Sequence, residues 1–129
     1  MTNSAILVVE DNPEEVDLIR EAMAEAVAGV TVTILGTVGD ALEWLALRPA
    51  DAGPLLVLTD HHLPDRPGHE LIAAIRAAPS IRHLPVVMVS GDGDRPAGLD
   101  GTDWYGKPET WNGWCALARL LVERHLPRA

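Results

Sequence analysis

The sequence predicts an α/β fold with a doubly wound sheet of five parallel strands in the order 2-1-3-4-5. Two observations lead to this prediction. Short runs rich in Leu, Ile and Val alternate with longer segments whose apolar residues recur at helical spacing. This alternation indicates parallel strands with helices on both faces of the sheet, and right-handed crossovers between successive strands favour this strand order.

The expected elements follow one another along the chain. The strands are mostly apolar or β-branched runs, and they are expected at 5–9, 30–35, 55–59, 84–90 and 102–105. The helices carry an apolar face, and they are expected at 13–28, 38–48, 68–78 and 111–126.

Local signals mark the ends of the helices. Asn12 or Asp11 can cap the first helix, and Pro13 suits its first position. Gly29 ends this helix, and Pro79 ends the third. The segment 91–101 is rich in Gly and Asp, so helix propensity there is poor. A fourth helix between the last two strands is therefore expected to be short or missing.

The stretch from Leu55 to Pro64 is the one around which the chain is organised. Its first residues carry no charge, which is typical of a strand that is buried on both faces. The strand ends at Asp60, although a carboxylate is costly to bury. The carboxyl ends of parallel strands form the ligand crevice of an open α/β sheet. Asp60 is therefore expected to be a reactive carboxylate.

Length and composition limit the possible classes of protein. The 129 residues fit a single domain spanning 1–129, and 47% of them are hydrophobic, which is enough for a core without disulfides. The single cysteine, Cys115, excludes an internal disulfide and fits a reducing compartment. No signal peptide and no membrane-spanning run is recognisable, so we expect a cytoplasmic protein without a membrane partner. The net charge of −9 argues against binding to nucleic acid.

Polar residues at the strand ends predict a functional site. The first and third strands are neighbours in this strand order, so Glu10, Asp11 and Asp60 are expected to share one crevice. Three carboxylates repel one another unless a cation is present, and oxygen ligands suit Mg²⁺ or Mn²⁺. Ser90 contributes a hydroxyl, and Lys107 contributes an ammonium. Such a pocket can neutralise a phosphoryl group, which Asp60 would take as an acyl phosphate.

At these residues the sequence resembles the receiver domain of two-component response regulators, over nearly its whole length. The motifs that carry the resemblance occur in order at strand ends: Glu10-Asp11-Asn12-Pro13, Asp60 with Leu63-Pro64 and Gly68, Ser90 after Pro85-Val86-Val87, and Lys107-Pro108. The resemblance implies the flavodoxin-like receiver form of the predicted fold. The opening motif and the length look most like stand-alone receivers, including those paired with phytochrome-type kinases.

The resemblance also implies a role for each site residue. Asp60 would accept the phosphoryl group from a phosphohistidine on a sensor histidine kinase, in a His-Asp phosphorelay. Glu10, Asp11 and Asp60 would bind Mg²⁺ together with the backbone carbonyl of His62. Lys107 would pair with Asp60 or with the phosphoryl group, and its peptide bond to the following proline is often cis in this family.

The switch residues that the resemblance implies are Ser90 and Trp104. Ser90 would contact the phosphoryl group in the active form. The switch aromatic of the family is usually Tyr or Phe, whereas here its position holds Trp104, and the segment 91–101 is shorter than in typical members. Output is expected through protein-protein contact. The two departures favour an alternative, an atypical receiver that acts as a phosphorylation-independent protein-binding module.

Several other side chains have simpler expected roles. His61 and His62 would point apart on an extended segment, so a transition-metal site is not expected. They are expected to shape access to Asp60 and to tune the lifetime of the phosphoryl group. Trp111 and Trp114 are expected to pack against the sheet, and exposure of either would make the last helix a candidate homodimer face.

Overall fold

The computed structural model describes residues 4–91 and 102–126 of the chain. Its elements alternate as predicted, in the order β1 (Ala5–Val9), α1 (Pro13–Ala26), β2 (Thr31–Leu35), α2 (Val38–Leu47), β3 (Leu55–Thr59), α3 (Gly68–Ala77), β4 (Val86–Ser90), β5 (Asp103–Gly106) and α4 (Trp111–His125). The predicted bounds agree with these to within two residues. The expected short or missing fourth helix falls within 92–101, which lies outside the described residues.

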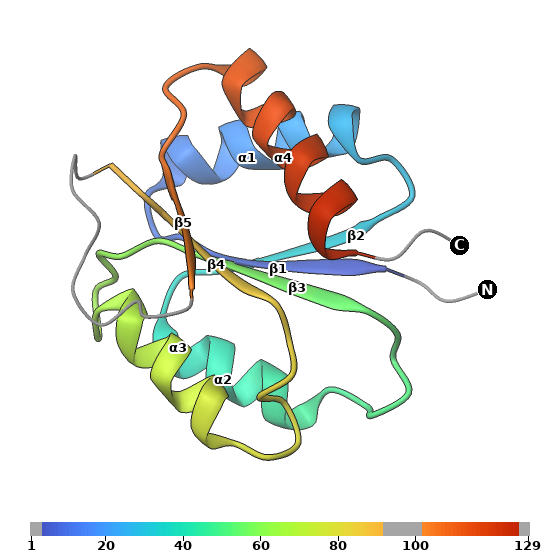
Figure 1. Cartoon of the computed structure of the whole chain (residues 1–129). Helices are drawn as coiled ribbons and strands as arrows, with labels where there is room; N and C mark the ends of the chain where they lie inside the picture. Colours follow the sequence, from blue (N-terminus) through green and yellow to red (C-terminus); the bar gives the residue numbers. More distant parts are fainter. Residues whose placement is uncertain (1–3, 92–101, 127–129) are drawn as a thin grey trace.

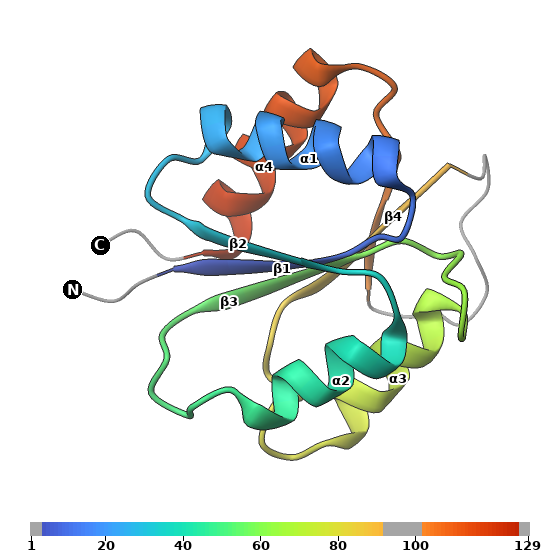
Figure 2. The same cartoon turned by 180° about the vertical axis from the view of Figure 1, so that it is seen from behind.

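The sheet has the predicted topology. Its five strands lie in the order β2-β1-β3-β4-β5, and every neighbouring pair is parallel. Helices α1 and α4 cover one face of the sheet, and α2 and α3 cover the other (Figures 1 and 2). The prediction of a doubly wound sheet is therefore confirmed, and the carboxyl ends of β1 and β3 lie next to each other.

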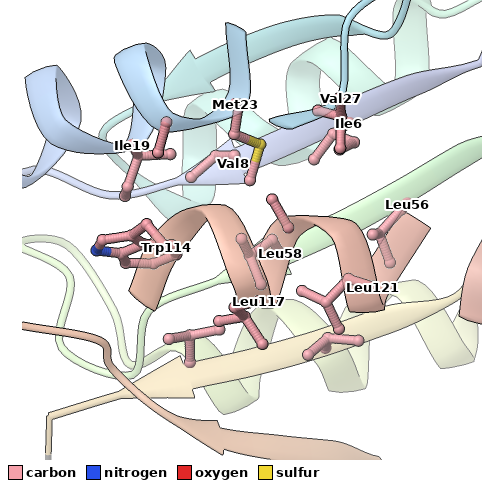
Figure 3. Close-up of a cluster of buried hydrophobic side chains, with 14 of the residues drawn as sticks. Ile6, Val8, Ile19, Met23, Val27, Leu56, Leu58, Trp114, Leu117 and Leu121 are labelled. Atoms are coloured by element: carbon pink, nitrogen blue, oxygen red, sulfur yellow. The ribbon is translucent and has the colours of Figure 1, made fainter. Parts of the chain in front are cut away.

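The core under α1 and α4 is built from side chains that alternate along the central strands. Four side chains of the central strands point toward the two helices: Ile6, Val8, Leu56 and Leu58 (Figure 3). They meet Ile19 and Met23 of α1, and Trp114, Leu117 and Leu121 of α4. Trp114 is fully buried in this cluster, as the sequence predicts, and so is Cys115. Trp111 is 40% exposed, so the prediction that it packs against the sheet is wrong. Burial on α4 begins only at Trp114, because Trp111 is the first residue of the helix.

A second core lies under α2 and α3. It contains Leu7, Val9, Leu55, Val57, Val86 and Met88 from the strands, together with Val38, Ala41, Leu45, Leu71, Ile72 and Ile75 from the helices. Trp104 packs against this cluster, whereas its neighbour Tyr105 packs against the first, because successive side chains of a strand face opposite sides. All five residues of β3 and of β4 are buried, which confirms that the third strand is covered on both faces.

No helix among the described residues is long and apolar enough to cross a membrane.

Candidate functional site: an acidic cluster with one lysine

The three predicted acids meet at the carboxyl edge of the sheet. The backbone N–H of Glu10 donates to the carbonyl of Leu35 at 2.9 Å, and that of Asp60 donates to the carbonyl of Val9 at 3.0 Å. These bonds extend the strand pairing by one residue and fix both acids at the strand ends. As a result, ligand oxygens of Glu10, Asp11 and Asp60 lie within 4.8 Å of one another.

Lys107 reaches this cluster from the loop after β5. Its peptide bond to Pro108 is trans, unlike the cis bond that is often found in the family. Its backbone N–H donates to the carbonyl of Ser90 at 2.9 Å, which holds the loop against the end of β4. Its Nζ lies 2.8 Å from Oε1 of Glu10 and 3.3 Å from Oδ2 of Asp60. Lys107 is also the only lysine in the chain. A single ammonium therefore bridges the acids of β1 and β3.

Glu10 is the most buried of the three acids, at 3% exposed, whereas Asp11 is exposed to solvent. The Oε2 atom of Glu10 accepts hydrogen bonds from the backbone N–H groups of Asp11 and Asn12, at 3.1 and 3.2 Å. Burial raises the pKa of the Glu10 carboxyl, and the hydrogen bond from Lys107 acts to lower it. The negative charge of Asp60 raises this pKa further. The Glu10 carboxylate therefore depends on the cation beside it.

The ammonium of Lys107 has the complementary environment. Burial acts to lower the pKa of Lys107, but the hydrogen bond to Glu10 and the negative charges of Asp60 and Glu10 outweigh it, so that the pKa is raised. Because the pKa is raised above its usual value near 10.5, the ammonium carries its charge throughout the neutral range.

The backbone after Asp60 turns tightly around the carboxylate. The N–H of His61 donates to Oδ1 of Asp60 at 2.8 Å, and the N–H of Gly68 donates to the carbonyl of His61 at 2.7 Å. A Cβ atom at position 68 would collide with the carbonyl oxygen of Asp60, so only glycine fits there. Gly68 therefore allows α3 to begin directly against the residue that the sequence predicts as phosphoacceptor.

Asp65 is a structural contact of this loop that the sequence did not suggest. Its two carboxylate oxygens accept hydrogen bonds from the backbone N–H groups of Val38 at 2.9 Å and Gly39 at 2.8 Å. These bonds tie the loop after Asp60 to the amino end of α2. The hydrogen bond from Gly39 is the main cause that lowers the pKa of Asp65, with a further contribution from the bond from Val38. No local pattern could have revealed a contact between segments so far apart in sequence.

Ser90 and Trp104 lie on neighbouring strands near the cluster. Ser90 is fully buried at the carboxyl end of β4, opposite Gly106 of β5. Trp104 lies opposite Met88 on β4 and is only partly buried. The Nε1 atom of Trp104 is buried and has no hydrogen-bond partner among the described residues. The roles of Ser90 and Trp104 in switching stay predictions.

The histidines beside Asp60 do not point apart as predicted. The ring centroids of His61 and His62 are 4.6 Å apart, and that of His69 is 5.8 Å from His61. The prediction assumed an extended segment, but the chain bends immediately after Asp60 and brings the rings together. The rings of His62 and His69 therefore both lie close to that of His61, the residue that directly follows Asp60.

The donor set of the cluster fits a hard divalent cation. Glu10, Asp11 and Asp60 offer carboxylate oxygens only, and oxygen ligands are what Mg²⁺ and Mn²⁺ prefer in proteins. The exposure of Asp11 leaves room for the water ligands that Mg²⁺ retains.

A parallel sheet in this strand order defines the class of flavodoxin-like α/β proteins, and here its carboxyl edge carries three acids and a lysine. Residues 6–103 match the family model of the response regulator receiver domain. The chain belongs to the response regulator receiver domain family.

Individual relatives agree with this assignment. The chain is 31% identical over 131 residues to a probable cyclic di-GMP phosphodiesterase of Vibrio cholerae; the match covers 98% of this chain but only 27% of that protein. It is 32% identical over 92 residues to the two-component response regulator ORR8 of Oryza sativa subsp. indica, covering 71% of this chain and 72% of that protein. The crystal structure of the phosphorylated cyanobacterial phytochrome response regulator RcpA superposes with a TM-score of 0.81 at 25% identity, covering 99% of this chain and 97% of that one.

Proposed function

We propose that this protein is a phosphoacceptor response regulator, a single receiver domain over residues 1–129 that takes a phosphoryl group on Asp60 from a sensor histidine kinase. The observation that carries the proposal is the convergence of the Asp60 carboxylate, two further acids and the only lysine at one edge of the sheet. Membership of the receiver family supports the same reading.

The proposed reaction transfers a phosphoryl group between two side chains. An oxygen of the Asp60 carboxylate attacks the phosphorus of a phosphohistidine and forms an acyl phosphate. The P–N bond of the donor breaks, and its electron pair stays on the imidazole nitrogen, which then takes a proton from water. The hydrogen bond from the His61 N–H to Oδ1 of Asp60 fixes the orientation of the carboxylate. The other oxygen, Oδ2, then faces the ammonium of Lys107.

Each neighbour of Asp60 has a role in this proposal. Lys107 would move from its bond with Glu10 to a phosphoryl oxygen and neutralise charge there. Ser90 would donate its hydroxyl to another phosphoryl oxygen, and Trp104 would respond as the switch aromatic. Mg²⁺ or Mn²⁺, held by Glu10, Asp11 and Asp60 with the backbone carbonyl of His62, would offset the charge of the incoming group.

The partner of the proposed reaction is a sensor histidine kinase. The overall similarity to a cyanobacterial phytochrome response regulator supports a kinase of the phytochrome type. Output through contact with another protein in the cytoplasm, without nucleic acid or a membrane, fits the acidic net charge.

A homodimer through α4 stays a prediction. From the sequence, α4 is a candidate dimer face if either tryptophan is exposed, and Trp111 is exposed. A second apolar side chain of α4, Leu120, is 45% exposed. With about 3.6 residues to a turn, these two side chains lie on opposite sides of α4 and do not form one apolar patch. Sedimentation velocity of the unmodified and phosphorylated protein tests this prediction.

The proposed function is tested with a small acyl-phosphate donor. Incubation with this donor and Mg²⁺ should add one phosphoryl group to the wild-type protein, as measured by intact mass. Asp60→Asn should gain none, and chelation of the metal should slow the gain. If no donor and no histidine kinase phosphorylates the wild type, the phosphorylation-independent binding module becomes the better account.

A further inference from the structure

A large cavity lies at the end of the sheet opposite to the acidic cluster. It has a volume of about 650 Å³ and lies against the amino ends of β3 and β4. Two of the helices that border it, α2 and α3, lie on the face of the sheet away from α1 and α4 (Figure 1), and His125 at the end of α4 also contributes to the lining. This volume falls within the range of roughly 300–1,000 Å³ that is usual for small-molecule sites. The proposed phosphorylation chemistry does not use this cavity.

Small side chains explain why the cavity exists. Ala46 of α2, Ala74 of α3 and Ala78, which directly follows α3, line it, where larger residues would occupy part of the space. Its floor is apolar, since the buried side chains of Leu55 and Leu84 contribute to the lining. Apolar walls of this kind favour an occupant with a hydrocarbon body, because burial of that body removes apolar surface from water.

The polar groups that line the cavity are basic or neutral. Arg48, Ser80 and His83 line it, and the only side-chain hydrogen bond of Arg48 among the described residues goes to the carbonyl of Gly53 at 3.0 Å. No carboxylate among the described residues pairs with Arg48. The remaining basic member of the lining, His125, already lies 3.4 Å from Asp103.

The charge of the chain makes this arrangement informative. In a protein with a net charge of −9, an arginine without an acidic partner within residues 4–91 and 102–126, beside an apolar cavity, is complementary to an anion. A guanidinium presents its donors in a fork that matches a carboxylate. The lining comes from α2, the segment 48–55, α3, the segment 78–85 and His125 of α4, so a bound molecule would be enclosed on several sides. That shape suits a small molecule better than a helix or strand of another protein.

We propose that this cavity binds a small amphipathic carboxylate, with its hydrocarbon part against the leucines and alanines and its carboxylate on Arg48. The site is separate from Asp60, so its occupancy does not require phosphorylation. The protein would then take a second, chemical input besides the phosphoryl group.

The test uses decanoate as the probe and the full chain as the protein. Titration calorimetry should show saturable binding at one site, and two-dimensional NMR should show shifts of the amides of Ala46, Ala74 and Ala78. Decanol and decylammonium, which match decanoate in length but not in charge, should bind at least about tenfold more weakly, because they lack the charged pairing with Arg48. Asp60→Asn should bind decanoate like the wild type, which separates this proposal from the proposed function.

Matched variants identify the site. Ala74→Leu places a larger side chain in the cavity and should weaken binding at least about tenfold, whereas Ala73→Leu, at an exposed position on the same helix outside the lining, should leave binding unchanged. Arg48→Gln should weaken binding about tenfold, as expected for loss of a charge-assisted hydrogen bond. Arg82→Gln, which removes an exposed arginine outside the lining, should leave binding unchanged. Absence of saturable binding, equal binding of decanol, or amide shifts confined to other parts of the chain would overturn the proposal.

Discussion

The ammonium of Lys107 lies closer to Glu10 than to Asp60, at 2.8 Å against 3.3 Å. The only lysine of the chain thus neutralises an acid that the sequence assigns to metal binding, as well as the predicted phosphoacceptor. Glu10 is almost fully buried, so its charge is the one that most needs this partner. The stability of the metal-free protein and the chemistry of the site therefore depend on the same side chain.

Removal of this ammonium should destabilise the metal-free protein. Lys107→Met leaves the carboxylates of Glu10 and Asp60 without a cation, and we expect a loss of about 2 kcal/mol in the free energy of unfolding. Mg²⁺ should restore part of the loss, because a divalent cation offsets the same charges. Urea unfolding with and without Mg²⁺ measures both effects. Arg119→Met, which removes an exposed cation on α4, is the control and should change stability by less than about 0.5 kcal/mol.

The bond between Asp65 and α2 predicts a pH-dependent contribution to stability. The pKa of Asp65 is lowered in the folded protein, so its contribution is present above the ordinary carboxyl value and is lost as the pH falls through the lowered value. Asp65→Asn should lower the urea midpoint at neutral pH, and this difference should vanish in strong acid. Asp51→Asn, an exposed acid outside this contact, is the control. Equal midpoints of wild type and Asp65→Asn at neutral pH would contradict the prediction.

Gly68 should not tolerate a side chain. In Gly68→Ala the added Cβ meets the carbonyl oxygen of Asp60, and either α3 or the loop has to shift, at a cost of about 3 kcal/mol. The added Cβ of Gly91→Ala would meet no heavy atom of the described residues within 4 Å, and this variant should change stability by less than about 1 kcal/mol. Thermal unfolding of the two variants side by side checks the difference. A Gly68→Ala protein as stable as the wild type would mean that the loop adapts without cost.

His62 should protect the acyl phosphate. Its ring packs against that of His61, which directly follows Asp60, and we expect its removal to make Asp60 more accessible to water. In His62→Ala we expect the acyl phosphate to decay at least about threefold faster, equivalent to roughly 0.7 kcal/mol in the barrier. Decay is followed by loss of phosphoprotein after the donor is removed. His83→Ala serves as the control because His83 lies at the opposite end of the sheet. An unchanged lifetime in His62→Ala would remove the proposed role of this histidine.

The sequence predicts those features that depend on local patterns. Uncharged runs such as Leu55–Thr59 identify the central strands, and the strand order then places Glu10 next to Asp60. The hydrogen bonds from Val38 and Gly39 to Asp65 do not depend on a local pattern, because they join a loop carboxylate to a distant segment of the chain. The sequence could not reveal them for that reason.

Side-chain exposure and cavities are also hard to predict from a pattern. Trp111 and Trp114 are three residues apart, as expected for one face of a helix, yet only Trp114 is buried. Trp111 is the first residue of α4, and it precedes the part of the helix that packs on the sheet. The hollow beside Ala74 and Ala78 depends on how far apart two helices lie. Helix spacing is a property of tertiary packing, and no single segment determines it.

The identity of the phosphoacceptor has a direct chemical test. After treatment with an acyl-phosphate donor and Mg²⁺, reduction with borohydride converts an aspartyl phosphate into homoserine, which tandem mass spectrometry locates in the chain. We expect homoserine at position 60 and at no other aspartate. Homoserine at position 11 instead, or a wild-type chain without any homoserine, would contradict it.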